Sequence, residues 1–360
     1  MSEKVLMKGN EAFSCAAIRN GCRFYFGYPI TPQNEIPEYM AREMDKVGGA
    51  FIQAESELAS VNMAYGAACA GGRVLISSSS PGIALMQEAF SFASSTEIPF
   101  VAINVSRAGP GIGTIQPGQA DYYQATRGGG NGDYHMVVYV PASIQEAVDT
   151  IGKAFDVADA YRNPVMVLVD GMLGQMMEPV VLPEMKKLEN IVSSEEEKPW
   201  ALSGHKNKRE RNKIQSLILQ PELLEKNVNR LAEKYKQMKS ELTEYETFDL
   251  NDADIVFVAY GTTARIADEA RDILAAEGIK VGLIRPITVW PFPYKAFEEI
   301  SSSTKMILSV ELSQGQMMDD VFIGVKGRWP VSLIKRVGGM WLTPPEVAEK
   351  AKAALAEVGL

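Results

Sequence analysis

The sequence has few of the side chains that bind metals through nitrogen or sulfur. Its 360 residues include two histidines, His135 and His205, and three cysteines, Cys15, Cys22 and Cys69. The cysteine spacing matches no zinc or iron–sulfur pattern, and two histidines are too few for a histidine-ligated metal centre. We therefore expect no metal ligands and no Ser-His-Asp triad in this chain, and cysteines that act as small buried hydrophobic residues.

Other common signatures are missing too. The sequence has no GxSxG nucleophile motif, no Walker-type phosphate loop and no apolar run long enough to span a membrane. Its start, "MSEKVLMKGNEAF", lacks the hydrophobic core of a signal peptide. Acidic residues outnumber basic ones by 45 to 36, and the net charge of −9 argues against binding to nucleic acid or to an anionic membrane. We expect a cytoplasmic protein.

Helix-like and strand-like segments alternate along most of the chain, which is typical of a parallel sheet covered by helices on both faces. A chain of 360 residues also favours about two domains. We predict an α/β domain over residues 1–181, a charged and partly helical linker over residues 182–247, and a smaller α/β domain over residues 248–360.

Hydrophobic periodicity and the Gly and Pro positions predict the individual elements. The helix that follows Thr31 would have this residue as its N-cap and Pro32 in its first turn. In the linker, the spacing of residues 221–246 predicts an exposed helix. The other predicted helices are residues 9–21, 55–72, 81–94, 142–162, 263–278 and 344–359, and the predicted strands are residues 23–29, 73–79, 99–106, 136–141, 164–171, 254–261, 280–287, 305–312 and 330–339.

Three polar segments directly follow predicted strands of the first domain. They are "YPITP" at residues 28–32, "SSSSPG" at residues 77–82 and "SRAGPGIG" at residues 106–113. Each could be an ordinary turn, because Ser, Gly and Pro are turn residues. Ligands of open α/β sheets bind beyond the carboxyl ends of the strands, so three such segments together favour a binding cleft.

Two kinds of charged residue could act in this cleft. Arg107 is either paired with a surface acid or positioned to bind a carboxylate with its forked guanidinium. Glu55 and Glu57 stand near the start of a helix rich in small residues, where the helix dipole favours acids. Because the rest of that helix looks buried, one of these carboxylates needs a polar partner, which the sequence does not name.

The segments "FYFGYPITPQNEIPEYM" and "QAESELASVNMAYGAACAGG" resemble the α subunit of thiamine-diphosphate-dependent 2-oxoacid:ferredoxin oxidoreductases. "DADIVFVAYGTTARIADEARDILAAEG" resembles the second domain of the same subunit, so the likeness covers nearly the whole chain. "RGGGNGDYHMVVYVPASIQEAVD" is most similar to the VorB-type subunit of the branched-chain, 2-oxoisovalerate enzymes, with the 2-oxoglutarate enzymes as runner-up. The resemblance implies a pyrimidine-binding-type α/β domain followed by a smaller domain like the transketolase C-terminal one.

The resemblance also implies a reaction and a set of site residues. The reaction is the oxidative decarboxylation of a 2-oxoacid, with coenzyme A as acyl acceptor and ferredoxin as electron acceptor. Glu57 falls on the family's catalytic carboxylate, which binds the cofactor's aminopyrimidine ring and promotes formation of the ylid. Substrate-binding positions of the family fall on Thr31 and Arg107, with Tyr28, Pro29 and Ile30 beside them. Ser80 departs from the family, which often has glycine there.

The chain lacks the remaining parts of such an enzyme. It has no GDG-type motif with a downstream asparagine for Mg²⁺ and diphosphate, and no cysteine set for an iron–sulfur cluster. We therefore expect a β subunit that brings the diphosphate and Mg²⁺ site. A γ subunit, a ferredoxin-like δ subunit or both would bring the [4Fe-4S] clusters, and the active site would lie at a subunit interface.

Two alternatives from other classes stay open at this stage. The first is an NAD-dependent dehydrogenase, although the G-x-G-x-G of "AGPGIGTIQPG" is a weak dinucleotide fingerprint because proline interrupts it. The second is a non-catalytic scaffold or electron-transfer docking subunit, in which the charged segment 182–247 would be the working part.

Overall fold

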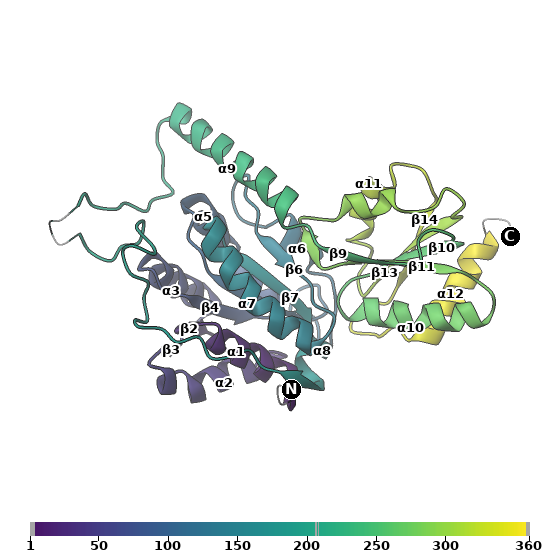
Figure 1. Ribbon diagram of the computed structural model, residues 1–360, viewed down its shortest axis with the longest axis horizontal. Helices are drawn as coiled ribbons and strands as arrows, with labels where there is room; N and C mark the ends of the chain where they lie inside the picture. The colour runs from purple at the N-terminus through teal and green to yellow at the C-terminus, as the bar shows by residue number, and fades with distance from the viewer. Residues whose placement is uncertain (1–3, 206, 208, 358–360) are drawn as a thin grey trace.

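The computed structural model describes residues 4–205, 207 and 209–357. Its first part is built around a seven-stranded sheet (Figure 1) in the order β12-β6-β7-β5-β4-β2-β3. All neighbours in this sheet are parallel except β12 and β6. The strands are β2 Phe24–Gly27, β3 Ala50–Gln53, β4 Val74–Ser78, β5 Val101–Ser106, β6 Val137–Tyr139, β7 Val165–Asp170 and β12 Thr288–Trp290.

Helices cover this sheet, and its central strands β4, β5 and β7 are buried along their whole length. Helix α1 packs against α7 and α8, and α3, α4 and α5 form a second group. The bounds are α1 Gly9–Arg19, α2 Glu35–Glu43, α3 Glu57–Cys69, α4 Ser80–Leu85, α5 Gln87–Thr96, α6 Tyr122–Thr126, α7 Ile144–Tyr161 and α8 Gly171–Gln175, with a 3₁₀ turn at Asp45–Val47. The three cysteines are buried and free, and burial raises the pKa of the Cys22 thiol to about 12.

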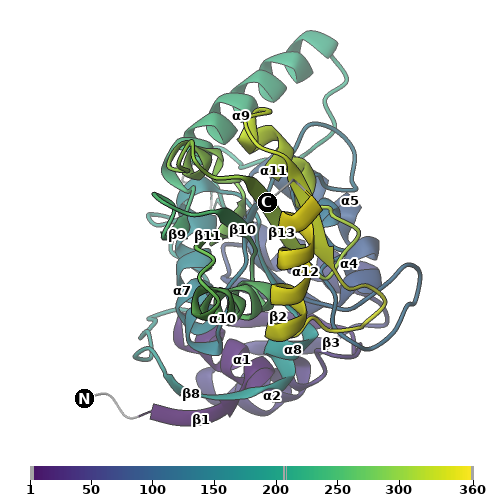
Figure 2. The same ribbon diagram turned by 90° about the vertical axis from the view of Figure 1, so that its right-hand side faces the viewer.

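A second sheet of five strands has the order β14-β13-β10-β11-β9. Its strands are β9 Tyr245–Phe248, β10 Ile255–Val258, β11 Val281–Pro286, β13 Met306–Glu311 and β14 Val331–Lys335. Helices α10 (Thr262–Ala276) and α12 (Pro344–Glu357) pack together beside it, and η2 (Tyr294–Glu298) and α11 (Met318–Val325) contact each other. Figure 2 shows this part from its outer side, together with the antiparallel pair β1 (Lys4–Lys8) and β8 (Met177–Val181) near the N-terminus.

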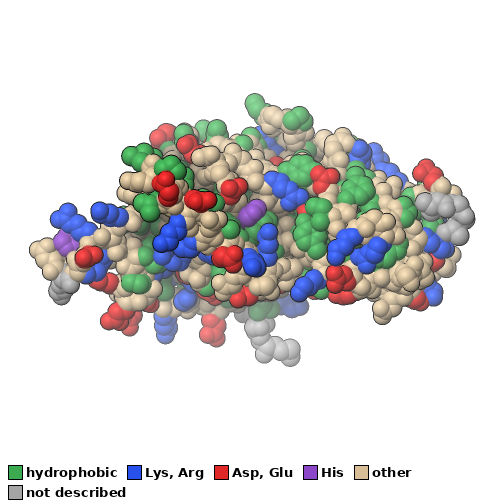
Figure 3. Space-filling view, turned by 90° about the horizontal axis from the view of Figure 1, so that it is seen from above, with side chains coloured by type: hydrophobic (Ala, Val, Ile, Leu, Met, Phe, Trp, Pro, Cys, Tyr) green, Lys and Arg blue, Asp and Glu red, His purple; other side chains and the backbone are tan. Residues whose placement is uncertain are grey.

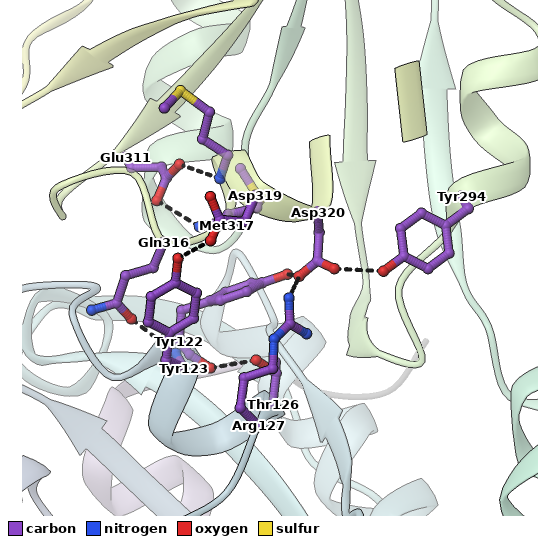
Figure 4. A network of polar contacts seen from close by, with 11 residues as sticks. Tyr122, Tyr123, Thr126, Arg127, Tyr294, Glu311, Gln316, Met317, Asp319 and Asp320 are labelled. Carbon is purple, nitrogen blue, oxygen red and sulfur yellow. Dashed lines mark hydrogen bonds and ion pairs between the residues drawn. The ribbon is translucent and has the colours of Figure 1, made fainter. Parts of the chain in front are cut away.

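Buried polar contacts join the two sheets (Figure 4). Asp320 of α11 is 0% exposed and accepts hydrogen bonds from Tyr122 OH at 2.6 Å, Arg127 Nη2 at 2.8 Å and Tyr294 OH at 2.5 Å. Gln119 bonds the backbone of Leu312 through both its own N–H and its side-chain oxygen, each at 3.0 Å. These contacts fix the second part of the chain against the loop that follows β5.

Three details of the sequence-based prediction are wrong. Helix α2 begins at Glu35 rather than after Thr31, because the backbone N–H of Gln33 bonds the carbonyl of Ile30 and forms a turn. The helix predicted over residues 81–94 is two helices, α4 and α5, which meet at Met86.

The third correction concerns the helix predicted over residues 221–246. Helix α9 (Pro221–Glu241) is mostly exposed, as predicted, and it buries Leu231, Tyr235 and Met238 on one side. It ends at Glu241, because Tyr245–Phe248 form strand β9. The last two residues of the helix predicted over residues 344–359 lie outside the described residues. Within the part of the chain that the structure describes, no helix has both the length and the hydropathy that a membrane span requires.

Candidate active site

Three polar turns meet at the carboxyl edge of the seven-stranded sheet. They follow the neighbouring parallel strands β2, β4 and β5 and comprise residues 28–32, 79–82 and 107–113. The strand register pairs the last residue of β2 with β4, and the last residue of β4 with β5, so the strands end close together. The structure therefore brings these segments to the edge at which α/β sheets bind ligands.

Glu57 is a buried carboxylate at this edge. It begins helix α3, whose N-cap Ser56 accepts a hydrogen bond from the backbone N–H of Ala59. Glu57 is 6% exposed, whereas Glu55 is exposed. A Cβ built at Gly82 would lie 2.5 Å from Glu57 Oε1, so the carboxylate contacts the turn after β4.

No hydrogen bond to the Glu57 carboxylate comes from the residues that the structure describes. The Glu57 oxygens are not among the fully buried atoms that lack a partner, so they keep some contact with water and can accept a hydrogen bond from a ligand. The side chain is thus suited to a ligand that donates a hydrogen bond. Gly82 packs closely against this side chain, because a Cβ at position 82 would lie 2.5 Å from Glu57 Oε1 and 2.0 Å from Ser78 Oγ.

Arg107 and Thr31, from two of the three turns, contact each other. Arg107 is 8% exposed, and its Nη1 donates a hydrogen bond to the backbone carbonyl of Thr31 at 3.0 Å. Its Nη2 donates to the carbonyl of Ile112 at 2.8 Å, while Nε is buried without a partner. The guanidinium is therefore anchored on the protein rather than paired with a surface acid.

Thr31 is half-buried, and its hydroxyl oxygen accepts a hydrogen bond from Asn34 Nδ2 at 3.4 Å. The hydroxyl hydrogen has no acceptor among the described residues. Tyr28 and Ile30 are partly buried, and Pro29 is exposed. These residues place one free hydroxyl donor among apolar and aromatic groups at the edge of the sheet.

A cavity of about 510 Å³ opens beside Thr31. Its walls are mostly apolar, and they include Met172, Met176 and Trp341. The charged residue of the wall is Glu35, which is bonded by Lys8 Nζ at 2.5 Å and by Asn10 Nδ2 at 2.7 Å. No lysine or arginine lines this cavity within the described ranges. The other lining residues are Pro32, Asn34, Ile115, Gln116, Pro117, Gly171 and Gln175.

Sequence analysis missed a buried chain of hydrogen bonds under the first turn. Ser77 Oγ donates to Gln33 Oε1 at 2.6 Å, so the Tyr25 hydroxyl, 2.7 Å from Ser77 Oγ, is its donor. Gln33 Nε2 in turn donates to the carbonyl of Tyr28 at 3.3 Å. Burial raises the pKa of Tyr25, which keeps this hydroxyl protonated. The only signal in the sequence was the position of Gln33 next to Pro32.

A second unpredicted network involves Asp121, a buried carboxylate. Asp121 Oδ2 accepts hydrogen bonds from Ser80 Oγ at 2.6 Å and from Asn104 Nδ2 at 2.8 Å. Ser80 Oγ also accepts from the backbone N–H of Arg107 at 2.9 Å. Burial raises the pKa of Asp121, although these hydrogen bonds oppose the shift. Ser80, at the position where glycine was expected, therefore links the second turn to the third.

Comparison with known proteins identifies the family. The family model "Pyruvate flavodoxin/ferredoxin oxidoreductase, thiamine diP-bdg" matches residues 15–250, and "Pyruvate:ferredoxin oxidoreductase core domain II" matches residues 253–347. The chain belongs to the 2-oxoacid:ferredoxin oxidoreductase family. This membership confirms the predicted family and replaces the alternative of an NAD-dependent dehydrogenase.

Within the 2-oxoacid:ferredoxin oxidoreductases the chain is VorB-like, as predicted. It is 44% identical to "Ketoisovalerate oxidoreductase subunit VorB" of Methanothermobacter thermautotrophicus over 96% of this chain and 97% of that protein. It is 37% identical to "2-oxoglutarate synthase subunit KorA" of Methanocaldococcus jannaschii over 96% of this chain and 98% of that protein.

Solved structures show the same fold. The 2-oxoglutarate:ferredoxin oxidoreductase of Magnetococcus marinus, with 2-oxoglutarate, coenzyme A and succinyl-CoA bound, matches with a TM-score of 0.85 and 25% identity. The match covers 98% of this chain and 66% of that longer one. A split-gene transketolase matches with a TM-score of 0.57 and 15% identity, over 97% and 98% of the two chains. These likenesses confirm the predicted α/β class with a thiamine-diphosphate-type domain and a second domain.

Proposed function

We propose that this chain is the α-type subunit of a CoA-dependent, branched-chain 2-oxoacid:ferredoxin oxidoreductase. In this reaction 3-methyl-2-oxobutanoate and coenzyme A yield the branched acyl-CoA and CO₂, while oxidised ferredoxin takes up the electrons one at a time. The proposal combines the family membership with the geometry of the edge where β2, β4 and β5 end.

The observation that carries the proposal is the buried, unpartnered carboxylate of Glu57. An aminopyrimidine ring offers the hydrogen-bond donor that this carboxylate lacks among the described residues. Thiamine diphosphate, when bound, supplies the chemistry that cleaves the bond between the carboxylate and the 2-oxo carbon. The part of Glu57 is to hold the ring and to exchange a proton with it.

Thr31 and Arg107 are proposed to hold the 2-oxoacid. The Thr31 hydroxyl can donate to a substrate oxygen, because it accepts rather than donates in its contact with Asn34. A guanidinium has five N–H donors, and Arg107 uses two of them on carbonyl oxygens, which leaves others for a carboxylate. Tyr28, Pro29 and Ile30 would shape the pocket around the substrate.

The cavity beside Thr31 supports a branched aliphatic substrate over 2-oxoglutarate. Its apolar walls suit a hydrocarbon side chain, whereas the second carboxylate of 2-oxoglutarate needs a cationic partner. Glu35 in the wall would repel that second carboxylate, and Lys8 is already bonded to Glu35. The VorB-type relative, which is named for ketoisovalerate, points in the same direction.

Partner subunits are part of the proposal. Apolar side chains near the site are exposed, with Leu58 at 48%, Met63 at 37% and Ile112 at 82%. A β subunit that covers them would bring Mg²⁺ and the diphosphate-binding groups. A γ subunit, a ferredoxin-like δ subunit or both would hold the [4Fe-4S] clusters and pass electrons to ferredoxin in the cytoplasm. We also propose that the first domain ends at residue 181 and that the second domain begins at residue 248, with the linker between them.

Viologen reduction by the complex purified from its own host tests the function. The assay contains coenzyme A and thiamine diphosphate, and it compares 3-methyl-2-oxobutanoate, 2-oxoglutarate, pyruvate and an aryl pyruvate. Preferential reduction with 3-methyl-2-oxobutanoate is expected. Preference for 2-oxoglutarate would replace the substrate assignment. No reduction with any oxoacid, from a complex with intact cofactor and clusters, would instead favour the scaffold alternative.

A further inference from the structure

A basic cleft of about 600 Å³ lies between the C-terminal half of α9, strand β12 and the segment that precedes β6. In Figure 3, green hydrophobic and blue basic side chains lie beside the histidine near the middle of the face, and red acidic side chains are also close to it. The cleft is separate from the candidate active site, because it borders the amino end of β6 whereas Glu57 lies at the carboxyl edge of the sheet.

The charge of this cleft is the reverse of that of the chain. The full sequence has a net charge of −9, yet the lining includes Arg127, Lys236, Lys239 and Lys295 and, among the described residues, no Asp or Glu. Lys239 and Lys295 have no carboxylate within 4 Å in the described part of the chain. Arg127 pairs with Asp320 at 2.8 Å and Lys236 with Glu233 at 3.7 Å. Lys239 and Lys295 are therefore the two cations of this concavity without a counter-charge among the described residues, and an anion bound between them would lower their repulsion.

The cleft also has an ordered aromatic floor. The His135 ring stacks on Trp290 with centroids 4.6 Å apart and planes 20° apart, and Lys239 Nζ lies 5.9 Å from the Trp290 ring. Burial, then Lys239 and Arg127, lower the pKa of His135 to about 4. The ring is thus neutral at physiological pH, because the nearby positive charges of Lys239 and Arg127 disfavour its protonation.

We propose that this cleft binds a small ligand that carries a phosphate or diphosphate group next to an apolar body. Lysine and arginine are the usual protein partners of phosphate, and Val289, Pro291 and Phe292 supply apolar surface beside them. A concavity of this volume fits a small molecule, whereas an acidic protein partner would meet a broad and flat surface. The inference does not depend on the proposed oxidoreductase function.

Calorimetric titration of the full chain at physiological salt tests the site with inorganic pyrophosphate, ADP and adenosine. The variant Lys239→Gln/Lys295→Gln removes two ammonium groups that have no acid partner. The control Lys280→Gln/Lys326→Gln removes two exposed lysines that pair with Asp252 and Glu298. We expect the affinity for pyrophosphate and for ADP to fall at least about 10-fold in the cleft variant. In the control variant both affinities should be unchanged.

The three probes also identify the ligand class. Tighter binding of ADP than of pyrophosphate is expected, because the body of the ligand would contact the apolar wall. Equal binding of the two would overturn the apolar part of the proposal, and tighter binding of adenosine than of pyrophosphate would overturn the phosphate part. The chain has only two histidines, so histidine NMR locates the site: the His135 ring resonances should move on binding and those of His205 should not. Absence of saturable binding, equal affinity in the cleft variant or an unmoved His135 would each overturn the inference.

Discussion

The guanidinium of Arg107 donates a hydrogen bond to the backbone carbonyl of Thr31 and a second one to that of Ile112, at 3.0 and 2.8 Å. One side chain therefore ties the turn after β2 to the loop after β5. The position of Thr31 depends on this fork, because its own side-chain contact, to Asn34, is long at 3.4 Å.

Arg107→Lys is expected to impair substrate binding. An ammonium group is a point charge and cannot span the two carbonyls as the planar fork does. Loss of one charged hydrogen bond costs about 1.5–3 kcal/mol, which corresponds to roughly a 10- to 100-fold lower kcat/KM for the oxoacid. Steady-state viologen reduction measures the kcat/KM for the oxoacid. The control variant is Arg42→Lys, at an exposed arginine, and its kcat/KM should be unchanged. An unchanged kcat/KM would refute the role of Arg107.

Glu57→Gln is expected to abolish most turnover while the fold is retained. The amide matches the carboxylate in size but cannot exchange a proton, and loss of general acid–base catalysis costs about 10²- to 10⁴-fold in kcat. Stability should change little, because the carboxylate makes no hydrogen bond with the described residues and the amide has the same size. Glu55→Gln, at the exposed neighbour, should behave as the unmodified chain. Near-normal kcat in Glu57→Gln would remove Glu57 from the mechanism.

Gly82→Ala tests the contact between the second turn and Glu57. The new Cβ would lie 2.0 Å from Ser78 Oγ and 2.5 Å from Glu57 Oε1, so side chains or backbone must move. We expect a loss of about 1–3 kcal/mol of stability together with lower activity. Gly66→Ala is the matched control in α3, because its Cβ would meet nothing within 4 Å, and helix propensity predicts a gain of up to about 1 kcal/mol. Urea unfolding of both variants separates the effects, and unaltered stability of Gly82→Ala would contradict the packing.

The position of the candidate site could be predicted from local patterns. Strands β4, β5 and β7 are short apolar runs, and each run is visible in the sequence because a fully buried strand needs apolar residues on both faces. Parallel strands end at one edge, so the segments that follow them had to meet there. Local patterns did not distinguish Glu57 from Glu55, whereas the family resemblance pointed to Glu57, which is the buried one of the two.

Features that join distant segments were not predictable. Strand β12 pairs with β6 of the first sheet although some 150 residues separate them. Thr, Val and Trp favour strands, but a run of three residues does not indicate a partner strand in the other part of the chain. The Tyr25–Ser77–Gln33 chain and the Asp121 network likewise depend on partners far away in the sequence. The prediction that Thr31 is the N-cap of the helix was wrong for a local reason, because the turn from Ile30 to Gln33 competes with helix initiation.

His135 should make stability dependent on pH below neutrality. Its folded-state pKa of about 4 lies below its ordinary value of 6.5, because burial, Lys239 and Arg127 outweigh Asp133. Between these values the unfolded chain binds a proton that the folded chain does not, so the free energy of unfolding falls as the pH is lowered from 6.5 towards 4. We expect His135→Gln to remove about 1–3 kcal/mol of this fall. Urea unfolding at pH 7, 5.5 and 4.5 measures it, with His205→Gln as the control, and an unchanged slope in His135→Gln would contradict the assignment.

Asp320→Asn is expected to loosen the junction between the two sheets. The carboxylate is 0% exposed and accepts from Tyr122, Arg127 and Tyr294, whereas an amide would turn an NH₂ group towards one of these donors. Breaking a buried charged contact costs about 3–5 kcal/mol. Asp319→Asn is the matched control, because the neighbouring Asp319 is exposed and bonds only Tyr123 among the described residues, so its loss should cost less than about 1 kcal/mol. Thermal unfolding of the two variants decides the matter: equal shifts in Tm would mean that Asp320 does not hold the two sheets together.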